Sequence, residues 1–237
     1  MRIRLQRDID RLKESIVSLG TLVEERVRMA VKAIQSRDAR LAQIVVDGDT
    51  EIDRLEVDIE EECLKILALH QPVADQLRYI VAILKMNNDL ERIGDLAVNI
   101  AEHEELVAHH GEPAIPFDYF TMGRKAEEML TKSLDALVNT DLWMAYEVLS
   151  QDDDVDAMKN AIQQQFAQEM RKPQDHPDSM IHMFLVSRHL ERIADHATNI
   201  AEDVIYMITG EIHRHRGAVV VRGSASWFRS AGPDESR

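Results

Sequence analysis

A sixteen-residue segment occurs twice in this chain, 100 residues apart. The first copy, NNDLERIGDLAVNIAE, covers residues 87–102, and the second, SRHLERIADHATNIAE, covers residues 187–202. LERI, the aspartate that follows it and NIAE are identical in the two copies. Self-similarity at a fixed spacing is typical of chains built from repeated structural units. The segment therefore predicts a duplicated architecture.

Apolar residues recur at steps of three and four along most of the chain, which is the period of an amphipathic helix. The first helix is expected from Leu5 to about Ser36. The second begins after Asp38, a residue type that caps helix N-termini, and ends before Pro72. The third is expected over about residues 73–108 and contains the first copy of the repeated segment.

The second half of the chain repeats this plan. Helices are expected over about residues 119–138, from the capping residue Asp141 onward, and over about residues 178–208 with Gly210 as the C-cap. The repeat extends beyond the sixteen-residue segment at a constant offset of 103: Asp38, Ala42, Asp49 and Asp53 align with Asp141, Ala145, Asp152 and Asp156.

The sequence therefore predicts an all-α protein of two tandem three-helix bundles, six helices related by an internal pseudo-two-fold repeat, with a flexible C-terminal tail. The expected units are residues 1–112 and 117–211, joined at the glycine- and proline-containing turn HHGEPAIP. Residues 212–237 contain five arginines without a helical period and are expected to be disordered. Leu64 and Leu77 are expected on the apolar faces that form the core.

Composition excludes several functional classes. The net charge of −15 disfavours nucleic-acid binding, and it disfavours anionic lipid surfaces unless the charge is locally reversed. Cys63 is the only cysteine, which fits a reducing cytoplasm, and the N-terminus has no apolar signal-peptide region. No apolar run reaches the length of a membrane span, so we expect a cytoplasmic protein that meets membranes only through partners.

Acidic pairs four residues apart are the main candidates for chemistry, because positions i and i+4 share one face of a helix. Each repeated segment has one such pair, and so does the second helix of each unit. If these two helices are antiparallel neighbours, the pairs face each other and could bind a hard cation such as Mg²⁺, Mn²⁺ or iron. The candidate metal ligands are Asp49, Asp53, Glu91, Asp95, Asp152, Asp156, Glu191 and Asp195.

Simpler interpretations stay open at this point. The acidic pairs could be solvated faces, neutralised by Arg92 and Arg192. His196 could be an extra ligand, or a histidine whose hydrogen bonds are satisfied elsewhere. Cys63 stands beside glutamates that raise a thiol pKa, which disfavours a nucleophile. No Glu-x-x-His pair and no glycine-rich nucleotide loop occurs, which disfavours a ferritin-type oxidase and nucleotide binding.

The segments NNDLERIGDLAVNIAE and SRHLERIADHATNIAEDVIY resemble the two signature segments of the PhoU family, accessory regulators of the bacterial phosphate-specific transport system. The resemblance extends over nearly the whole chain to about residue 212, and the extension from about Gly217 departs from it. It implies two similar three-helix bundles side by side, a cytoplasmic location, a homodimer and no enzymatic activity.

The resemblance also implies a function. Members of the family repress the phosphate-starvation response when phosphate is plentiful. They link the ATPase subunit of the phosphate ABC transporter to a membrane sensor histidine kinase. Some members hold metal ions, or iron or zinc clusters, on acidic pairs that correspond to the eight candidates named above. Two alternatives are a metal-storage or metal-buffering protein and an accessory protein of a low-affinity phosphate permease.

Overall fold

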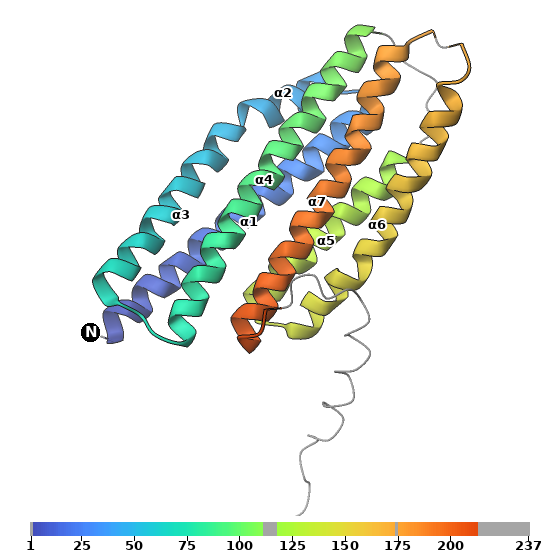
Figure 1. The fold of residues 1–237 in the computed structure, drawn as a ribbon. Helices are drawn as coiled ribbons and strands as arrows, with labels where there is room; N and C mark the ends of the chain where they lie inside the picture. Colours follow the sequence, from blue (N-terminus) through green and yellow to red (C-terminus); the bar gives the residue numbers. More distant parts are fainter. Residues whose placement is uncertain (1, 111–117, 174, 213–237) are drawn as a thin grey trace, which may run out of the picture.

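The chain is all-α in the part that its computed structural model describes, residues 2–110, 118–173 and 175–212 (Figure 1). The helices are α1 (Arg2–Ser36), α2 (Ala39–Asp47), α3 (Asp49–His70), α4 (Asp75–His110), α5 (Tyr119–Asn139), α6 (Leu142–Glu169) and α7 (Pro177–Thr209). This confirms the predicted fold class. Most of the HHGEPAIP turn and nearly all of the predicted tail lie outside the described residues.

None of the described helices has the continuous apolar stretch that a membrane span requires.

The first turn of each unit has the same backbone geometry. Arg37 and Thr140, which are equivalent at the offset of 103, both have a left-handed backbone, with φ of 52° and 54°. Asp38 and Asp141 follow them as N-caps, and each carboxylate accepts hydrogen bonds of 2.9–3.1 Å from two N–H groups of the next helix. The repeat seen in the sequence is therefore a repeat of local structure.

The second predicted helix of the first unit is divided at Gly48 into α2 and α3. A Cβ atom on Gly48 would lie 2.4 Å from Cζ of Arg26, so the Arg26 guanidinium occupies the space that another side chain would need. The equivalent position in the second unit is Gln151, and α6 continues through it without a break. Glycine is also the weakest helix former after proline, which favours the break at this position.

The two units pack against each other through α4 and α7, which form the most extensive helix pair (Figure 1). The two helices are antiparallel, because Lys85 contacts Asp203 while His103 contacts His182. The two copies of the repeated segment therefore lie side by side in opposite directions. Helices α3 and α6 flank this central pair, and α1 packs against α5 behind it.

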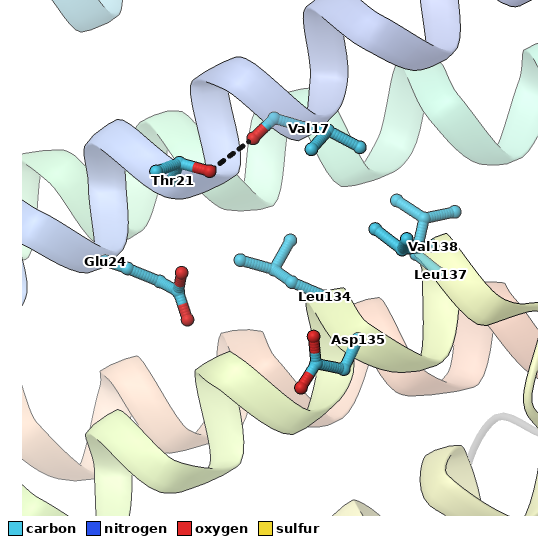
Figure 2. A pocket seen from close by; sticks show the side chains of 7 residues that line it. All are labelled: Val17, Thr21, Glu24, Leu134, Asp135, Leu137 and Val138. Atoms are coloured by element: carbon cyan, nitrogen blue, oxygen red, sulfur yellow. Dashed lines mark hydrogen bonds between the residues drawn. The ribbon is translucent and has the colours of Figure 1, made fainter.

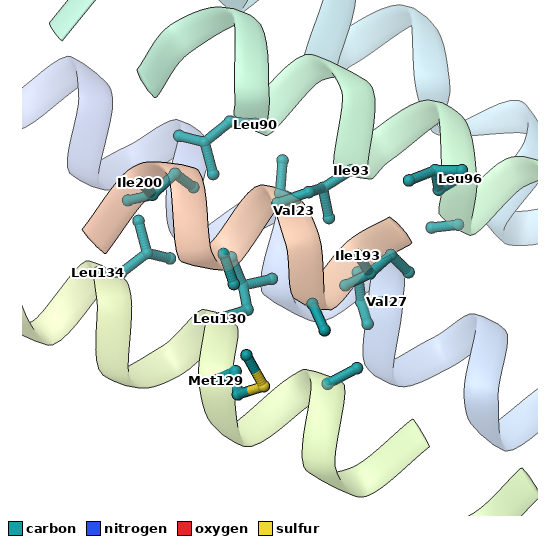
Figure 3. Close-up of a cluster of buried hydrophobic side chains, with 14 of the residues drawn as sticks. Val23, Val27, Leu90, Ile93, Leu96, Met129, Leu130, Leu134, Ile193 and Ile200 are labelled. Atoms are coloured by element: carbon teal, nitrogen blue, oxygen red, sulfur yellow. The ribbon is translucent and has the colours of Figure 1, made fainter. Parts of the chain in front are cut away.

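One apolar core extends through both units. Leu90 and Ile93 of α4 are fully buried with Ile193 and Ile200 of α7, above Leu130 of α5 (Figure 3). The core therefore joins the units as well as holding each one together.

Two of the predicted core residues are exposed. The exposed fraction is 54% for Leu64 and 41% for Leu77, so their assignment to the core was wrong. Leu77 lies in the first turn of α4, at the end of the bundle. For Leu64 the reason is the position of α3 at the edge of the molecule, where its main contacts are with α1 and α4. Such a helix buries a narrower stripe of side chains than a central one.

Candidate functional site: two acidic faces beside the central helix pair

The close approach of α3 to α4 depends on Gly94 of the first repeated segment. Gly94 is buried, and a Cβ atom there would lie 3.0 Å from Cδ1 of Ile52 on α3. The equivalent residue in the second segment is Ala194, also buried. Both equivalent positions thus have a small residue that is buried.

A hydrogen bond fixes the register of the same two helices. The buried Asn87 amide donates to the backbone carbonyl of Glu56 at 2.9 Å. Asn87 opens the first repeated segment, and Ser187, which opens the second, instead donates to its own helix at Phe184. The α3–α4 pair therefore has an interhelical hydrogen bond that the second unit lacks at the equivalent position.

The first acidic face lies between α3 and α4 and contains the four predicted residues of the first unit. Burial raises the pKa of Asp49, and the nearby charges of Asp53 and Asp95 raise it further. Burial likewise raises the pKa of Glu91, followed by the charge of Asp95. The carboxylates of each helix thus raise the pKa of a carboxylate on the other helix, as facing pairs require.

Arg92 partly neutralises this face. Its guanidinium lies 3.5 Å from Oε2 of Glu91 and 3.4 Å from Oδ2 of Asp95, and it lowers the pKa of Glu91. Its side chain remains mostly exposed, so its contacts are weakened by solvent. The predicted neutralisation by this arginine is therefore present but incomplete.

The second acidic face lies between α6 and α7 and contains the four predicted residues of the second unit. Burial and the charges of Glu191, Asp152 and Asp156 raise the pKa of Asp195 to about 6. Burial and the charge of Asp156 also raise the pKa of Asp152, against a hydrogen bond of 3.4 Å from Thr198 that lowers it. The carboxylates of the second face are therefore coupled like those of the first.

The two faces differ in one residue that the sequence analysis missed. Lys159 of α6 places its Nζ 3.0 Å from Oε1 of Glu191, and this hydrogen bond raises the pKa of Lys159. The equivalent residue on α3, at the offset of 103, is Glu56. Burial and the charges of Glu60 and Asp53 raise the pKa of Glu56. At this position the second face thus has a lysine where the first has an additional acid.

The donor groups fit a hard cation that keeps part of its water shell. All eight predicted ligands are carboxylates, and Oδ1 of Asp49 is buried without a hydrogen-bond partner. Within the described ranges, no three His, Cys, Asp or Glu side chains converge closely enough to enclose a metal ion. Mg²⁺ and Mn²⁺ suit such a site, because they bind through one or two carboxylates and several waters, whereas zinc prefers nitrogen and sulfur.

Two further residues take the simpler of their predicted roles. His196 does not join Asp195, because its Nδ1 lies 2.8 Å from Oδ1 of Asp89 across the α4–α7 contact, where Asn199 also donates at 3.2 Å. Cys63 is fully buried, and burial with the charges of Glu62 and Glu60 raises its pKa to about 12. Its thiol therefore stays protonated near neutral pH.

Three histidines form a second feature that the sequence analysis did not identify. His103 of α4 lies between two histidines of α7, with its Nδ1 3.2 Å from Nδ1 of His182 and its Nε2 3.2 Å from Nε2 of His189. Burial, followed by the neighbouring histidines, lowers the pKa of His103 to about 4. Because the two contacts use opposite nitrogens of one ring, the three side chains do not surround a single metal position.

A shallow pocket between α1 and α5 has a different character (Figure 2). Its walls are mainly Val17, Leu134 and Val138, with the carboxylates of Glu24 and Asp135 beside it. Its volume of about 100 Å³ is well below that of typical pockets for metabolites, roughly 300–1,000 Å³. We therefore assign no small-molecule site there.

Comparison with known proteins agrees with this architecture. The model of the PhoU domain matches twice, over residues 16–103 and 120–204. A phosphate-specific transport system accessory protein PhoU homolog from Caulobacter vibrioides is 37% identical over 206 residues, 86% of this chain and 89% of that protein. A homolog with the same description from Aquifex aeolicus is 36% identical over 216 residues, 90% of this chain and 97% of that protein.

Solved structures show the same fold. PhoU from Pseudomonas aeruginosa is 35% identical, with a TM-score of 0.83 over 87% of this chain and 99% of that one. The phosphate transport system regulatory protein PhoU from Streptococcus pneumoniae is 27% identical, with a TM-score of 0.80 over 88% of this chain and 98% of that one. On sequence and structure together, this chain belongs to the PhoU family.

Proposed function

We propose that this protein is a negative regulator of phosphate uptake and of phosphate-starvation signalling. It acts by binding, and it couples the ATPase subunit of a phosphate ABC transporter to a sensor histidine kinase. The observation that carries the proposal is the match of both units to the PhoU domain, with relatives named as accessory proteins of the phosphate-specific transport system. We place the regulator in the cytoplasm as a homodimer.

The architecture supports a binding role. The central α4–α7 pair holds the two units in one rigid core, with an acidic face on each side of it. An extended helical surface of this kind suits contacts with two proteins at once, whereas the small α1–α5 pocket does not suit a substrate. The regulator would therefore work as a scaffold between transporter and kinase.

Affinity capture tests the coupling directly. A tagged full-length chain, cross-linked in cells grown in high phosphate, should retain both the transporter ATPase subunit and the sensor kinase. The same capture after phosphate starvation should retain less of the kinase. Recovery of neither protein, together with abundant bound metal, would favour the metal-storage alternative. Recovery of a low-affinity permease in place of the ABC transporter would favour the permease accessory alternative.

We further propose that the acidic faces bind Mg²⁺, Mn²⁺ or iron, and that the cation orders the helix surfaces that meet the partners. Support comes from the buried oxygen of Asp49 and from the raised pKa values of Asp49, Glu91, Asp152 and Asp195. A cation between the facing pairs would relieve the repulsion that raises these pKa values.

Substitution of four ligands tests the metal proposal. Glu91→Ala, Asp95→Ala, Glu191→Ala and Asp195→Ala in one protein should lower the bound metal found by elemental analysis, while the helical circular dichroism is unchanged. A matched control removes four exposed carboxylates elsewhere: Glu14, Glu25, Asp58 and Glu105. Equal metal content in the two variants would contradict the proposal.

A further inference from the structure

Helices α1 and α5 pack against each other with the internal two-fold symmetry of the molecule. A Cβ atom on Gly20 of α1 would lie 2.9 Å from Cδ2 of Leu134 on α5. A Cβ atom on Gly123 of α5 would lie 2.8 Å from Cγ1 of Val31 on α1. Gly123 and Leu134 are equivalent to Gly20 and Val31 at the offset of 103, so the two contacts correspond to each other. Each position in this helix pair can therefore be compared with its equivalent.

An ion pair joins the two helices in one half of this symmetric arrangement. Nε of Arg28 on α1 lies 3.1 Å from Oε1 of Glu127 on α5. The equivalent residues at the offset of 103 are Thr131 on α5 and Glu24 on α1. The symmetry therefore places an uncharged threonine beside Glu24, where Glu127 meets a guanidinium. Arg28 lies one turn beyond Glu24 on α1, but its guanidinium contacts Glu127.

The α1–α5 pocket lies at this second position, beside Glu24 (Figure 2). The Glu24 side chain extends from α1 toward α5, where Leu134 and Val138 provide apolar walls. The other charged residue that lines the pocket is Asp135. Its equivalent in the other half is Lys32. Thus Glu24 is accompanied by a second acid at a place where the other half of the helix pair has a lysine.

The negative charge of the pocket is not compensated by the neighbouring cations. Among the described residues, neither Glu24 nor Asp135 forms an ion pair. Lys13 lies at the edge of the pocket, where it donates to the backbone carbonyl of Val138 at 3.1 Å. The other nearby cations of α1 and α5 already contact acids, in the pairs Arg28–Glu127, Arg124–Glu128 and Lys132–Glu147. The pocket therefore combines apolar walls with two carboxylates that are available to an external cation.

We propose that the α1–α5 pocket binds an arginine side chain of a partner protein. The methylene groups of the arginine lie on Leu134, and the guanidinium lies between the carboxylates of Glu24 and Asp135, like the guanidinium in the ion pair of the other half. The volume of about 100 Å³ suits a single side chain, although it is too small for a metabolite. Arginines are frequent among the residues that dominate binding at protein interfaces. The proposal does not depend on which transporter or kinase the protein serves.

A peptide with a single arginine tests the pocket. The probe is Ala-Ala-Arg-Ala-Ala with blocked ends, and the control peptide has citrulline, an uncharged analogue, in place of arginine. In methyl NMR spectra of the full chain, the arginine peptide should shift the signals of Val17, Leu134 and Val138. It should bind roughly fivefold or more tightly than the citrulline peptide, because two partly exposed ion pairs distinguish them. Glu24→Gln with Asp135→Asn should remove this preference.

An arginine introduced into the chain itself should compete for the same pocket. Thr131→Arg places a guanidinium at the position equivalent to Arg28 and one helical turn from Asp135. It should weaken binding of the arginine peptide roughly tenfold or more, because an intramolecular group has a high effective concentration. The matched control, Gln164→Arg, adds the same charge at an exposed position of α6 and should bind the peptide like the unchanged protein.

Three results would overturn the proposal. The first is equal binding of the arginine and citrulline peptides, or binding of neither, because the carboxylates would then make no contact with a guanidinium. The second is a set of methyl shifts that does not include the pocket residues, because the peptide would then bind to another acidic surface. The third is a lower assembly mass of Thr131→Arg in analytical ultracentrifugation, because a second copy of the chain would then occupy the pocket.

Discussion

Asp195 connects the electrostatics of the second acidic face to stability. Its pKa is raised to about 6 from 3.8, so between these values the folded protein binds more protons than the unfolded chain, and stability rises as the pH falls. Asp195→Asn should therefore raise the free energy of unfolding at pH 7.5 in the presence of a chelator. We expect roughly 1 kcal/mol, because solvent screens this partly exposed carboxylate.

Urea unfolding at pH 7.5 and pH 4 measures this difference. The gain from Asp195→Asn should shrink at pH 4, where the unchanged carboxyl group is largely protonated in the folded state. The control is Glu105→Gln, which changes an exposed carboxylate on a different helix, α4. This substitution should change the free energy of unfolding little at either pH. A variant less stable than the unchanged protein at pH 7.5 would show that Asp195 makes a net stabilising contact.

Glu56 and Lys159 give the two acidic faces different charges. The two faces should therefore differ in their affinity for a cation. The ammonium of Lys159 already contacts Glu191, so the α3–α4 face should bind Mn²⁺ more tightly than the α6–α7 face. Glu56→Lys should weaken the tighter site by roughly tenfold or more, and Lys159→Glu should strengthen the weaker one, because affinity follows the charge of the ligand set. Isothermal titration with Mn²⁺ measures both. Two sites of equal affinity in the unchanged protein would contradict this view.

The contribution of His103 to stability changes with pH in the opposite direction to that of Asp195. The pKa of His103 is lowered to about 4 in the folded protein, so the unfolded chain binds more protons between pH 4 and 6.5. Its neutral form thus contributes stability that is complete above pH 6.5 and is lost as the pH falls toward 4. His103→Gln should flatten this loss by about 1 kcal/mol per pH unit at most, measured by thermal unfolding across that range. An unchanged slope would show that protonation is accommodated without breaking the histidine contacts.

At the scale of single elements, the α3–α4 contact depends on Gly94. A Cβ atom at this position would approach Ile52 to 3.0 Å, and a branched side chain would force the two helices apart. Gly94→Val should cost roughly 1–3 kcal/mol, the usual range for overpacking a core. Urea unfolding measures the loss. Ala157→Val on the exposed side of α6 is the control and should cost no more than roughly 0.7 kcal/mol through helix propensity.

The helices could be predicted closely from the sequence, because their signals are local. Asp38, Asp141 and Gly210 act as caps where the sequence places them. The division at Gly48 could not be predicted from glycine alone, because Gly20 lies inside α1 without a break. The exposure of Leu64 likewise follows from the edge position of α3, which no local pattern specifies.

The candidate site could be predicted in part, because only some of its determinants are local in the sequence. Spacing of four residues placed each acidic pair on one helix face, but which faces meet depends on tertiary packing. The charge difference between the faces was visible in principle, since aligning the units at the offset of 103 sets Glu56 against Lys159. The histidine group at His103 had no such signal, because its members occupy non-equivalent positions of the two repeats.

At the scale of the whole molecule, the two units repeat the same helix arrangement, the frame of the molecule, but differ in the charged residues that they present. The antiparallel α4–α7 pair and the α1–α5 pair behind it relate the two units by a pseudo-two-fold axis. The frame presents two acidic faces of unequal charge beside a single core. Such a molecule is suited to holding different partners on different surfaces, as the proposed role between a transporter and a kinase would require.

A phosphate-starvation reporter tests this regulatory role most directly. In cells that lack the gene and grow in high phosphate, the reporter should be fully active. The unchanged gene on a plasmid should restore repression, and Glu14→Ala with Glu105→Ala should restore it equally. The variant that lacks Glu91, Asp95, Glu191 and Asp195 should restore less. A reporter that stays repressed in high phosphate after deletion of the gene would contradict the account.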